Sequence, residues 1–462
     1  MQELNLGYHY PIIYWNTACL IINAGANEEL DDNKSTQYGK IAKAIANFKQ
    51  RSIIVDRPLI NEAKFSFVPD EKNNRIIFSF KGLCGIGDDI ARAIVEHQPY
   101  SSFEDFCKRM VDTKIIGTAK MIILIKAGCF NELDSPDRME TMKKFLSRNV
   151  FTPTDKLTMQ QFNSALEYDI FPKEMETMIR IKNFKAYALH ESFFLKNIID
   201  EGKKVPKKGY HDRYFALDER GTEFLMEHFN TCIVGTKEDG VIISEKLFNK
   251  EWDALIQPLK DYMALPETLQ LYNQKKLDST MESYASGSLE QWDMESLSYY
   301  QDRHELWNLN EPKYGVVDYN SLPEIPEVYD YTTRRVRGEI KHFPKYKIFR
   351  LAGTVLDSDN NKHLVTLLTN HSVVTCKYNK GQYSYYNKRI SEQTPAGKKK
   401  VLEESWFKRG SKIIVCGYRR EDQFVVTKYA DTVYTHTTNR IEEIYNDGTI
   451  LAQTDRKKVG EE

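Results

Sequence analysis

The first fifty positions carry apolar residues with the spacing of helices. Residues 10–24 are apolar on most sides and are entered through Pro11, which is typical of a buried helix with proline in its first turn. In residues 37–50, Ile41 and Ile45 belong to an apolar stripe with intervals of three and four residues. This second stretch predicts an amphipathic helix.

Extended runs follow these two helices. A short strand is expected at 52–55, and runs at 64–68 and 75–80 are separated by the turn formers PDEKNN, so the two runs predict a β-hairpin. Its second strand leads directly into three expected helices, at 88–97, 102–110 and 117–127.

The long stretch 133–320 is mostly helical in pattern. A pair of strands is expected near 232–234 and 241–244, and the small, polar residues 284–289 predict a linker. The clearest helical segments are 138–148, 159–167, 173–188 and 253–263.

From residue 345 the pattern changes to the alternation of strands. FRLAGTVLDSDNNKHLVTLLTNHSVVTCKYNKGQY predicts three strands, and SKIIVCGYRREDQFVVTKY predicts two more. Five antiparallel strands with a long excursion between the third and fourth fit an OB-fold, a small Greek-key barrel that binds oligonucleotides; a generic β-meander is the alternative. The predicted fold class is α+β and multidomain, a helical region followed by a C-terminal five-stranded OB-fold barrel.

The stretch FSFKGLCGIGDDIA, residues 78–91, carries the most specific local signal. A strand end is followed by a Gly-x-Gly turn, Gly85 and Gly87, and by a helix that begins near Asp88. This is helix-hairpin-helix spacing, in which turn amides and a helix N-terminus face outward and bind a phosphate without reading sequence. A plain strand–turn–helix connection with an Asp cap is the alternative. The later run KIIGTAKMIILIKAGCF is a candidate for a degenerate second copy.

Charge is strongly segregated although the formal net charge of the 462 residues is −1. Residues 331–430 contain 21 Lys and Arg against 8 Asp and Glu, whereas residues 216–330 contain 9 against 23. The basic block indicates a polyanion partner. The acidic block is interpreted as a solvated surface, with a docking face or a negative guard as the alternatives.

Features that the sequence does not contain indicate the cellular compartment of the protein. The seven cysteines are scattered without a CxxC pair, which favours a reducing compartment. The N-terminal residues do not have the pattern of a signal peptide, and no apolar run approaches the length that spans a membrane. A cytoplasmic location is therefore expected.

Several motifs stand in an order that resembles a known family. HYP, RPLINEAKFSF, FSFKGLCGIG, YSSFEDFCKRM and LIKAGCFNEL form one set, and MESLSYYQDRHEL, KYNKGQYSYYNKRIS and SWFKRGSKIIVCGYRREDQF form a second. Together they resemble the C-terminal half of the catalytic alpha subunit of bacterial DNA polymerase III, the C-family replicases, in a branch common in phages. The resemblance covers about residues 5–135 and 286–455, and 136–285 matches nothing in the family.

The resemblance implies a division of the chain into six parts. These are 1–80, the end of the fingers with the β-hairpin; 81–135, the helix-hairpin-helix domain; 136–285, a mostly helical insertion of unknown role; 286–340, a connector helix and linker; 341–440, the OB-fold; and 441–462, a C-terminal tail. The implied function is to hold template and duplex DNA for a palm domain on another polypeptide. The alternatives are a non-catalytic accessory protein that binds single-stranded DNA, and an interaction protein that binds a clamp or a replicase.

In the family, the hairpin turn contacts duplex DNA. Carried over to this sequence, the contacting residues are Lys81, Gly82, Gly85, Ile86 and Gly87. The family usually has a Lys just before its Gly-x-Gly. Here that position is Cys84, and Lys81 is the expected substitute.

A second DNA-binding surface is predicted where tyrosines alternate with cations, on and after the third barrel strand. Aromatic rings stack on unpaired bases and cations contact phosphates. The predicted stacking residues are Tyr378, Tyr383, Tyr385 and Tyr386, and the predicted phosphate contacts are Lys388, Arg389, Arg419 and Arg420. Packing of some of these tyrosines on the barrel is the alternative.

No catalytic or metal-binding residue is predicted in this chain, and no cofactor. Nucleotidyl transfer needs clustered carboxylates for two metal ions, whereas the Asp-x-Asp pair Asp357 and Asp359 fits a hairpin turn. Mg²⁺ is expected in the family's palm. The expected partners are DNA, a polypeptide with the PHP, palm and thumb domains, and a sliding clamp. Candidate clamp-binding peptides are 274–277 and 291–294, and ordinary helix surface is the alternative for both.

Overall fold

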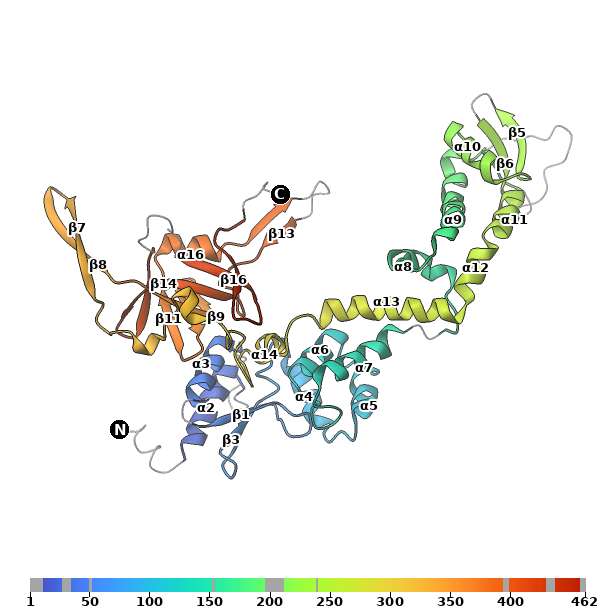
Figure 1. Ribbon diagram of the computed structural model, residues 1–462. Coiled ribbons are helices and arrows are strands. Elements are labelled where there is room, and N and C mark those ends of the chain that lie inside the picture. Colours follow the sequence, from blue (N-terminus) through green and yellow to red (C-terminus); the bar gives the residue numbers. More distant parts are fainter. Residues whose placement is uncertain are drawn as a thin grey trace. The chain divides into compact units, whose positions relative to one another are not determined.

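The computed structural model describes most of the chain (Figure 1). The described residues are 11–26, 35–49, 52–151, 154–195, 212–237, 240–393, 399–428 and 437–457. The chain divides into two compact units, one formed by Met1–Met142 with Ser286–Glu462 and the other by Lys143–Ala285. The first unit contains both stretches that resemble the replicase family, and the second unit is inserted between its two segments.

Within the described residues, the first unit begins with two helices and a small sheet. α2 (Ile12–Ala24) ends at Gly25, whose φ of 64° lets its amide close the last turn. α3 (Tyr38–Lys49) buries the predicted apolar stripe, so both predicted helices are confirmed. The sheet has the order β1-β3-β2 and contains the predicted hairpin with shorter strands. Its strands are β1 (Ile54–Asp56), β2 (Val68–Asp70) and β3 (Arg75–Ile77).

Short helices after this sheet enclose an aromatic cluster. The rings of Phe103 and Phe106 meet the ring of Phe130 edge to face, with centroids 5.1 and 5.0 Å apart. All three rings are buried, which holds the helices together around one core. The elements are α4 (Asp88–Glu96), α5 (Phe103–Phe106), a π-helical turn at Cys107–Val111, α6 (Thr118–Lys126) and α7 (Arg138–Val150).

The chain returns to the first unit through α14 (Leu289–Leu297), which packs on α6. The buried carboxylate of Asp293 accepts from Arg57 at 2.7 Å and from Arg138 at 2.6 Å. A buried carboxylate is tolerated only when it is paired in this way. The ion-pair network therefore fastens the returning chain to the helix-hairpin-helix region.

The C-terminal strands close into the five-stranded barrel that the alternation predicts. β9 pairs with β10, β10 with β11, β11 with β15 in parallel, and β14 pairs with both β15 and β9. This is the strand order of an OB-fold. The strands are β9 (Phe349–Asp359), β10 (Leu364–Leu368), β11 (Val373–Lys377), β14 (Lys412–Arg420) and β15 (Gln423–Val426).

Further elements surround the barrel. The long excursion between β11 and β14 contains a helix and a two-stranded sheet, and two later strands extend the sheet beside β14. A long β-hairpin precedes the barrel, in residues predicted to be linker and barrel. These elements are α15 (Glu311–Tyr314), β7 (Val328–Val336), β8 (Glu339–Tyr346), α16 (Lys380–Asn387), β12 (Ile390–Gln393), β13 (Lys399–Glu403), β16 (Thr438–Ile444) and β17 (Ile450–Gln453).

The second unit is helical with one small antiparallel sheet of order β4-β6-β5. The predicted strand pair is confirmed as β5 and β6, and the helix predicted at 253–263 is divided at Ile256, where Pro258 enters the next helix. The elements are α8 (Phe162–Glu167), α9 (Glu176–Ala188), β4 (Tyr214–Ala216), α10 (Glu219–His228), β5 (Ile233–Lys237), β6 (Gly240–Ser244), α11 (Glu245–Leu255), α12 (Gln257–Ala264) and α13 (Pro266–Tyr284).

Candidate nucleic-acid interface

The first helix-hairpin-helix turn has the backbone that its sequence predicts. Gly85 has a φ of 81°, a conformation that side chains of L residues rarely adopt. Gly87 is the exposed N-cap of α4, and no side chain caps that helix end. A Cβ at Gly87 would meet nothing within 4 Å. An anion can therefore approach the N-terminal amides of α4 past Gly87.

Three other residues predicted at this hairpin support the turn from within. A Cβ at Gly82 would lie within 3.0 Å of two buried Phe rings, so this glycine permits close packing. Ile86 is also buried. The ammonium of Lys81 pairs with Asp88, and the Lys81 side chain is only 12% exposed. The prediction that these three residues contact DNA directly is corrected, because packing and pairing occupy them.

A cation from elsewhere in the chain lies at this turn. Lys120, in the first turn of α6, donates from Nζ to the carbonyl oxygen of Gly85 at 2.6 Å. Cys84, which replaces the family's Lys, is buried with its Sγ 2.9 Å from the hydroxyl of Ser298, and burial raises the pKa of its thiol. Lys120 is 35 residues from Gly85 in the chain, so local spacing could not identify it.

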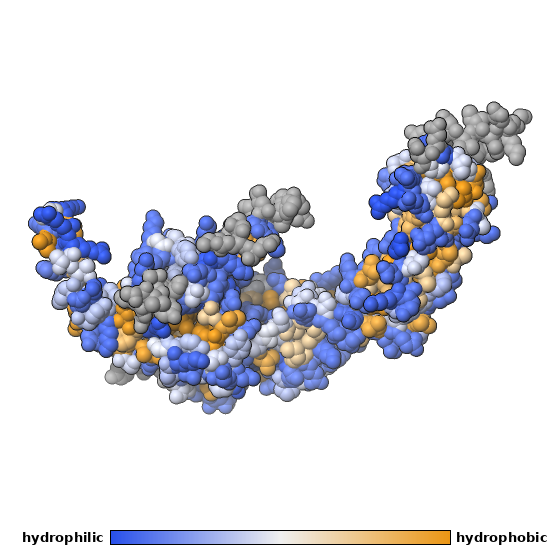
Figure 2. Space-filling view, turned by 45° about the horizontal axis from the view of Figure 1, so that its top comes forward, coloured by the Kyte–Doolittle hydropathy of each residue, from blue (hydrophilic) through white to orange (hydrophobic). Residues whose placement is uncertain are grey.

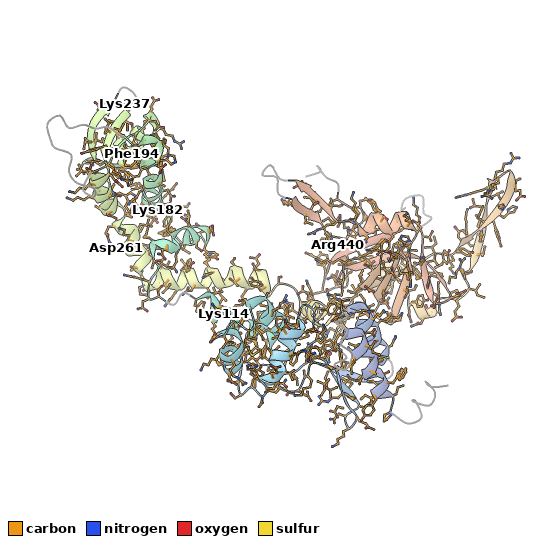
Figure 3. The ribbon with its side chains drawn as sticks, turned by 180° about the vertical axis from the view of Figure 1, so that it is seen from behind. Lys114, Lys182, Phe194, Lys237, Asp261 and Arg440 are labelled. Carbon is orange, nitrogen blue, oxygen red and sulfur yellow. The ribbon has the colours of Figure 1, made fainter. Side chains whose placement is uncertain are left out.

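The second hairpin repeats the geometry of the first at its helix cap. Gly117 caps α6 with φ −82° and ψ 163°, against −82° and 166° for Gly87 at α4, and a Cβ at Gly117 would meet nothing within 4 Å. The first turn of α4 contains two acids, Asp88 and Asp89, whereas that of α6 contains none. Lys114 lies in the exposed loop that precedes α6 (Figure 3). The second hairpin is therefore the more favourable end for an anion.

The barrel buries most of the tyrosines that were predicted to stack on bases. Residues 380–387 form α16, because the Asn379 side chain caps a helix by accepting from the amide of Gln382. The exposed fractions of Tyr378, Tyr383 and Tyr386 are 2%, 3% and 6%. Their prediction as base-stacking residues is therefore wrong, since the rings form part of the barrel core.

Tyr385 is the exception, with 51% of its surface exposed. It lies on the outer face of α16, and its ring meets that of Tyr386 edge to face with centroids 5.0 Å apart. Tyr385 is exposed although Tyr386 is buried, because adjacent residues on a helix point in different directions. Tyr385 stays a predicted stacking residue.

The four residues predicted to contact phosphates differ in whether their charged groups are already bonded within the protein. The Arg419 guanidinium donates to the Leu322 carbonyl oxygen and to Glu324, both at 3.0 Å, so it fastens β14 to the preceding segment. Arg389 forms an ion pair of 3.1 Å with Glu404 on the surface, and Lys388 is exposed. Arg419 is thus a structural residue, whereas Lys388 and Arg389 remain predicted contacts.

The fourth predicted contact, Arg420, belongs to a cluster that sequence spacing did not reveal. The rings of Tyr346 and Tyr418 have centroids 4.5 Å apart, and the Arg420 guanidinium lies 5.6 and 5.8 Å from them. Arg420 also donates to the Tyr346 hydroxyl at 3.2 Å. This cluster lies beside the β14–β15 turn, and that turn is one of the loops with which OB-folds bind oligonucleotides.

The Asp-x-Asp pair was predicted to lie in a hairpin turn, but both residues belong to β9, and Asp359 is the last residue of that strand before the turn to β10. Asp359 accepts from the amides of Lys362 and Asn361, and these bonds hold the pKa of its carboxyl below the ordinary value. Asp357 contacts α3 at Gly39. Within the described ranges, no group of three His, Cys, Asp or Glu side chains is arranged to hold a metal ion.

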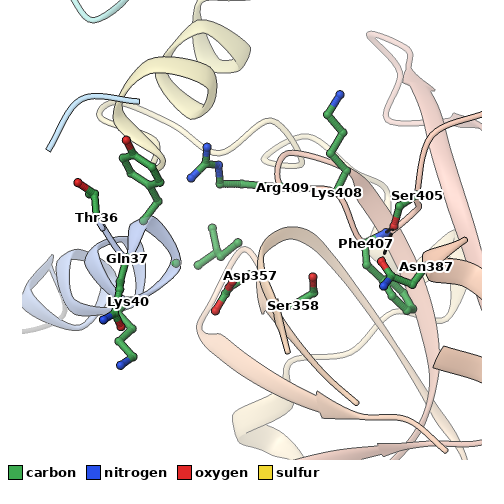
Figure 4. A pocket seen from close by; sticks show the side chains of 13 residues that line it. Thr36, Gln37, Lys40, Asp357, Ser358, Asn387, Ser405, Phe407, Lys408 and Arg409 are labelled. Carbon is green, nitrogen blue, oxygen red and sulfur yellow. Dashed lines mark hydrogen bonds between the residues drawn. The ribbon is translucent and has the colours of Figure 1, made fainter. Parts of the chain in front are cut away.

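A polar cavity of about 460 Å³ lies between α3 and the barrel. Figure 4 shows Thr36, Gln37 and Lys40 on the α3 side, with Lys408 and Arg409 on the barrel side. The Arg409 guanidinium lies 4.6 Å from the centroid of the Tyr38 ring. The cavity thus carries cations from both sides, which favours an anionic occupant.

His304 serves packing rather than chemistry. Its ring nitrogens lie 2.8 Å from Asn370 Oδ1 and 2.9 Å from Thr354 Oγ1, and burial lowers its pKa to about 4. The neutral ring therefore bridges the connector and the barrel at neutral pH.

Both candidate clamp-binding peptides are helical and point their apolar residues inward. Leu277 in α13 is buried, and so are Trp292 and Met294 in α14. A clamp pocket would need these side chains free, so neither peptide is available in this structure. Of the helices that the structure describes, none is long and apolar enough to cross a membrane.

Comparison with known proteins agrees with the site geometry. Residues 52–140 match the family model of the helix-hairpin-helix motif. The chain is 40% identical over 470 residues to a "Probable DNA polymerase YorL" of Bacillus subtilis (strain 168) and to a "DNA-directed DNA polymerase" of Bacillus phage SPbeta. The chain is related to DNA polymerases. These matches cover 99% of this chain but 34% of each relative, so the chain spans about a third of the length of the curated relatives it matches.

Proposed function

We propose that this chain is the DNA-binding, C-terminal portion of a C-family replicative DNA polymerase, and that it holds template and duplex for a palm domain outside these residues. The observation that carries the proposal is the pair of uncapped helix N-termini, at Gly87 and Gly117, with nearly identical backbone angles. Two such helix ends are suited to holding the sugar–phosphate backbone of a duplex without reading its sequence. A replicase needs this kind of grip because it copies every sequence.

At the hairpins, duplex phosphates would lie against the N-terminal amides of α4 and α6. Lys120 supplies positive charge at the first turn, where Asp88 is already neutralised by Lys81. Of the hairpin residues predicted from the sequence, Gly85 and Gly87 remain proposed DNA contacts, and the structure adds Gly117 and Lys120 to the proposal.

At the barrel, single-stranded template would lie near Tyr346, Tyr418 and Arg420, and over α16. The rings of the first two are partly exposed, and Arg420 brings charge to the same place. Tyr385, Lys388 and Arg389 are proposed to contact the strand further along. Combining exposed rings with cations is the usual means of binding single strands without sequence preference.

Catalysis and Mg²⁺ are proposed to belong to carboxylates outside this chain. The Asp357–Asp359 pair does not fit that task, because the backbone amides of the turn occupy Asp359. The bacterial relative, named as a probable DNA polymerase, is about three times as long as the matched region, which leaves room for such a palm. A chain of this function would work in the bacterial cytoplasm, where the DNA is replicated.

Helix α2 offers a surface for the palm-bearing region. Ile12, Trp15 and Ile22 lie on one face of α2 and are 54%, 48% and 66% exposed, while Ile13 and Leu20 are buried on the other. An apolar face of this kind on a surface helix indicates a partner surface. We propose that the polypeptide with the PHP, palm and thumb domains covers it; a sliding clamp remains a proposed partner without an assigned peptide.

Primer extension with the full chain tests this function. Homogeneous protein is expected to bind primer–template DNA and, with Mg²⁺ and nucleotides, to extend no primer. Adding the region that corresponds to the remaining two thirds of the relatives is expected to restore extension. Extension by the chain alone would refute the division of labour, and binding without restored synthesis would favour the accessory or interaction protein.

A further inference from the structure

The hairpin of β7 and β8 has no covering partner within the described part of the chain. Most of its residues are exposed on both faces, including Tyr331 at 60% and Ile340 at 67%. In Figure 2 it forms a mostly hydrophilic projection with a small hydrophobic area. An isolated two-stranded hairpin is marginally stable in water, so we infer that it functions against a partner.

The strand register places like charges opposite one another. Arg334 is directly paired with Lys341 across the two strands, and Arg335 is paired with Ile340 on the other face. Like charges at paired positions destabilise a hairpin. An anionic partner would remove this penalty by lying across both side chains.

The turn adds a further cation in an unfavourable backbone. Arg337 and Gly338 form the two-residue turn with φ values of 52° and 87°, which is a type I′ pattern. Asn or Gly is usual at the first of these positions, because other side chains resist positive φ. Arginine at the tip therefore lowers the stability of the turn, and its charge is the property that could offset this cost.

The cations at the base of the hairpin are paired with acidic residues, whereas those near its tip are not. At the base, Lys345 pairs with Asp330 at 2.7 Å and Lys347 pairs with Glu327 at 3.4 Å. Among the described residues, no ion pair involves Arg334 or Arg337, and Lys341 reaches Glu339 only at 3.8 Å. Residues 328–346 contain 5 Lys and Arg against 2 Asp and Glu. The net charge lies at the tip, where salt bridges leave it available.

The base of the hairpin continues into the barrel cluster. Tyr346 is the last residue of β8, and its ring and hydroxyl contact Tyr418 and Arg420 respectively. The base of the hairpin therefore adjoins the barrel cluster, and the free cations of the hairpin lie toward its other end.

We propose that β7 and β8 form a DNA-binding arm, residues 328–346, which lies along duplex DNA with Arg334, Arg335, Arg337 and Lys341 against the phosphates. A two-stranded ribbon has dimensions that the major groove accepts. The arm binds any sequence, because its exposed tip offers charge rather than a pattern of base-reading amides. This inference rests on the proposed DNA-binding function and adds a third contact region to the hairpins and the barrel.

The test removes charge without weakening the arm. In the variant R334T/R335T/R337N, threonine suits a strand, the like-charge pair is removed, and Asn-Gly is the preferred type I′ turn. The full chain is titrated with labelled duplex DNA at several salt concentrations. Losing three phosphate contacts is expected to flatten the slope of log K against log[salt] by about 2.7, since each contact contributes about 0.9 on B-DNA.

A matched control removes the same charge elsewhere. Lys173, Lys246 and Lys250 are exposed on the second unit, and their replacement by Gln is expected to leave the slope unchanged. A second measurement places a benzophenone side chain at position 333, where cross-links to duplex DNA are expected.

The outcomes distinguish this proposal from the one on which it rests. A wild-type chain that binds no DNA refutes both. Normal binding together with an unchanged slope in the arm variant and no cross-links refutes the arm alone. An arm variant that keeps its slope but loses the restored primer extension would instead identify the arm as a surface for the palm-bearing polypeptide.

Discussion

The clearest test of the hairpin grip is a side chain placed at Gly87. Gly87 has ordinary negative φ, is exposed, and would place a Cβ in open space. Gly87→Val should therefore cause no steric clash, and it should lower the free energy of unfolding by about 1 kcal/mol, because valine is a poorer N-cap residue than glycine. Its isopropyl group would stand where a phosphate must approach the amides of α4.

The expected loss of affinity follows from the hydrogen bonds that are blocked. A hydrogen bond to a charged group contributes about 1.5–3 kcal/mol, so losing one raises the Kd for duplex DNA by about tenfold to a hundredfold. The salt slope should hardly change, because an amide contact releases no counterion through a cation of the protein. Gly117→Val should behave in the same way at α6.

The assay is fluorescence anisotropy of a labelled duplex of arbitrary sequence, measured at several salt concentrations. Gly235→Val is the matched control, because Gly235 lies in β5 of the second unit and its Cβ would make only ordinary contacts of 3.7 Å or more. A folded Gly87→Val protein with wild-type Kd would show that the α4 N-terminus does not touch DNA. Weakening on one sequence but not on others would also contradict the reasoning.

Three further outcomes are expected. Lys120→Gln should weaken duplex binding and flatten the slope of log K against log[salt] by about 0.9. The same change at Lys72, which is exposed on the β2–β3 turn, should leave that slope unchanged. If the Lys120 variant has the same slope as the wild type, Lys120 does not contact DNA. Tyr383→Ala should lower the free energy of unfolding, measured by chemical denaturation, by about 3–5 kcal/mol. Tyr385→Ala should leave the free energy of unfolding nearly unchanged and should weaken binding of single-stranded DNA, measured by titration. A large loss of stability in Tyr385→Ala would show instead that Tyr385 is the packing residue. Because the pKa of His304 is lowered to about 4, the unfolded chain binds the proton first, and stability should fall as pH drops from about 6.5 towards 4. The loss attributable to this ring is about 2 kcal/mol at pH 5, and thermal unfolding of His304→Gln should show a correspondingly weaker pH dependence.

Local patterns predicted the barrel and the hairpin turn well. The five strands alternate strongly, and Gly85 and Gly87 define the turn by their spacing alone, so neither depended on distant contacts. The helix α16 was missed because its tyrosines suggested a strand. Asn379 followed by Gln382, three residues later, is a cap signal that could have identified it.

The features of the candidate site that could not be predicted from the sequence depend on long-range contacts. The carbonyl of Gly85 meets Lys120, and Tyr346 meets Tyr418, only because the fold brings distant segments together. The β7–β8 hairpin escaped prediction for a different reason. Its residues have no apolar–polar alternation, since neither face packs on a core, and the usual strand signal is therefore absent.

The chain leaves the first unit and returns to it at one place. Arg138 donates to both the Leu289 carbonyl oxygen and the Asp293 carboxylate, so the two crossing points are bonded directly to each other. The residues between them behave as one closed loop. The entropic cost of closing a loop grows only with the logarithm of its length. Replacing the loop of more than a hundred residues by one of about ten would therefore change the free energy of loop closure by roughly 2 kcal/mol. Lineages could therefore gain, lose or replace the intervening module without redesigning the DNA-holding scaffold on either side.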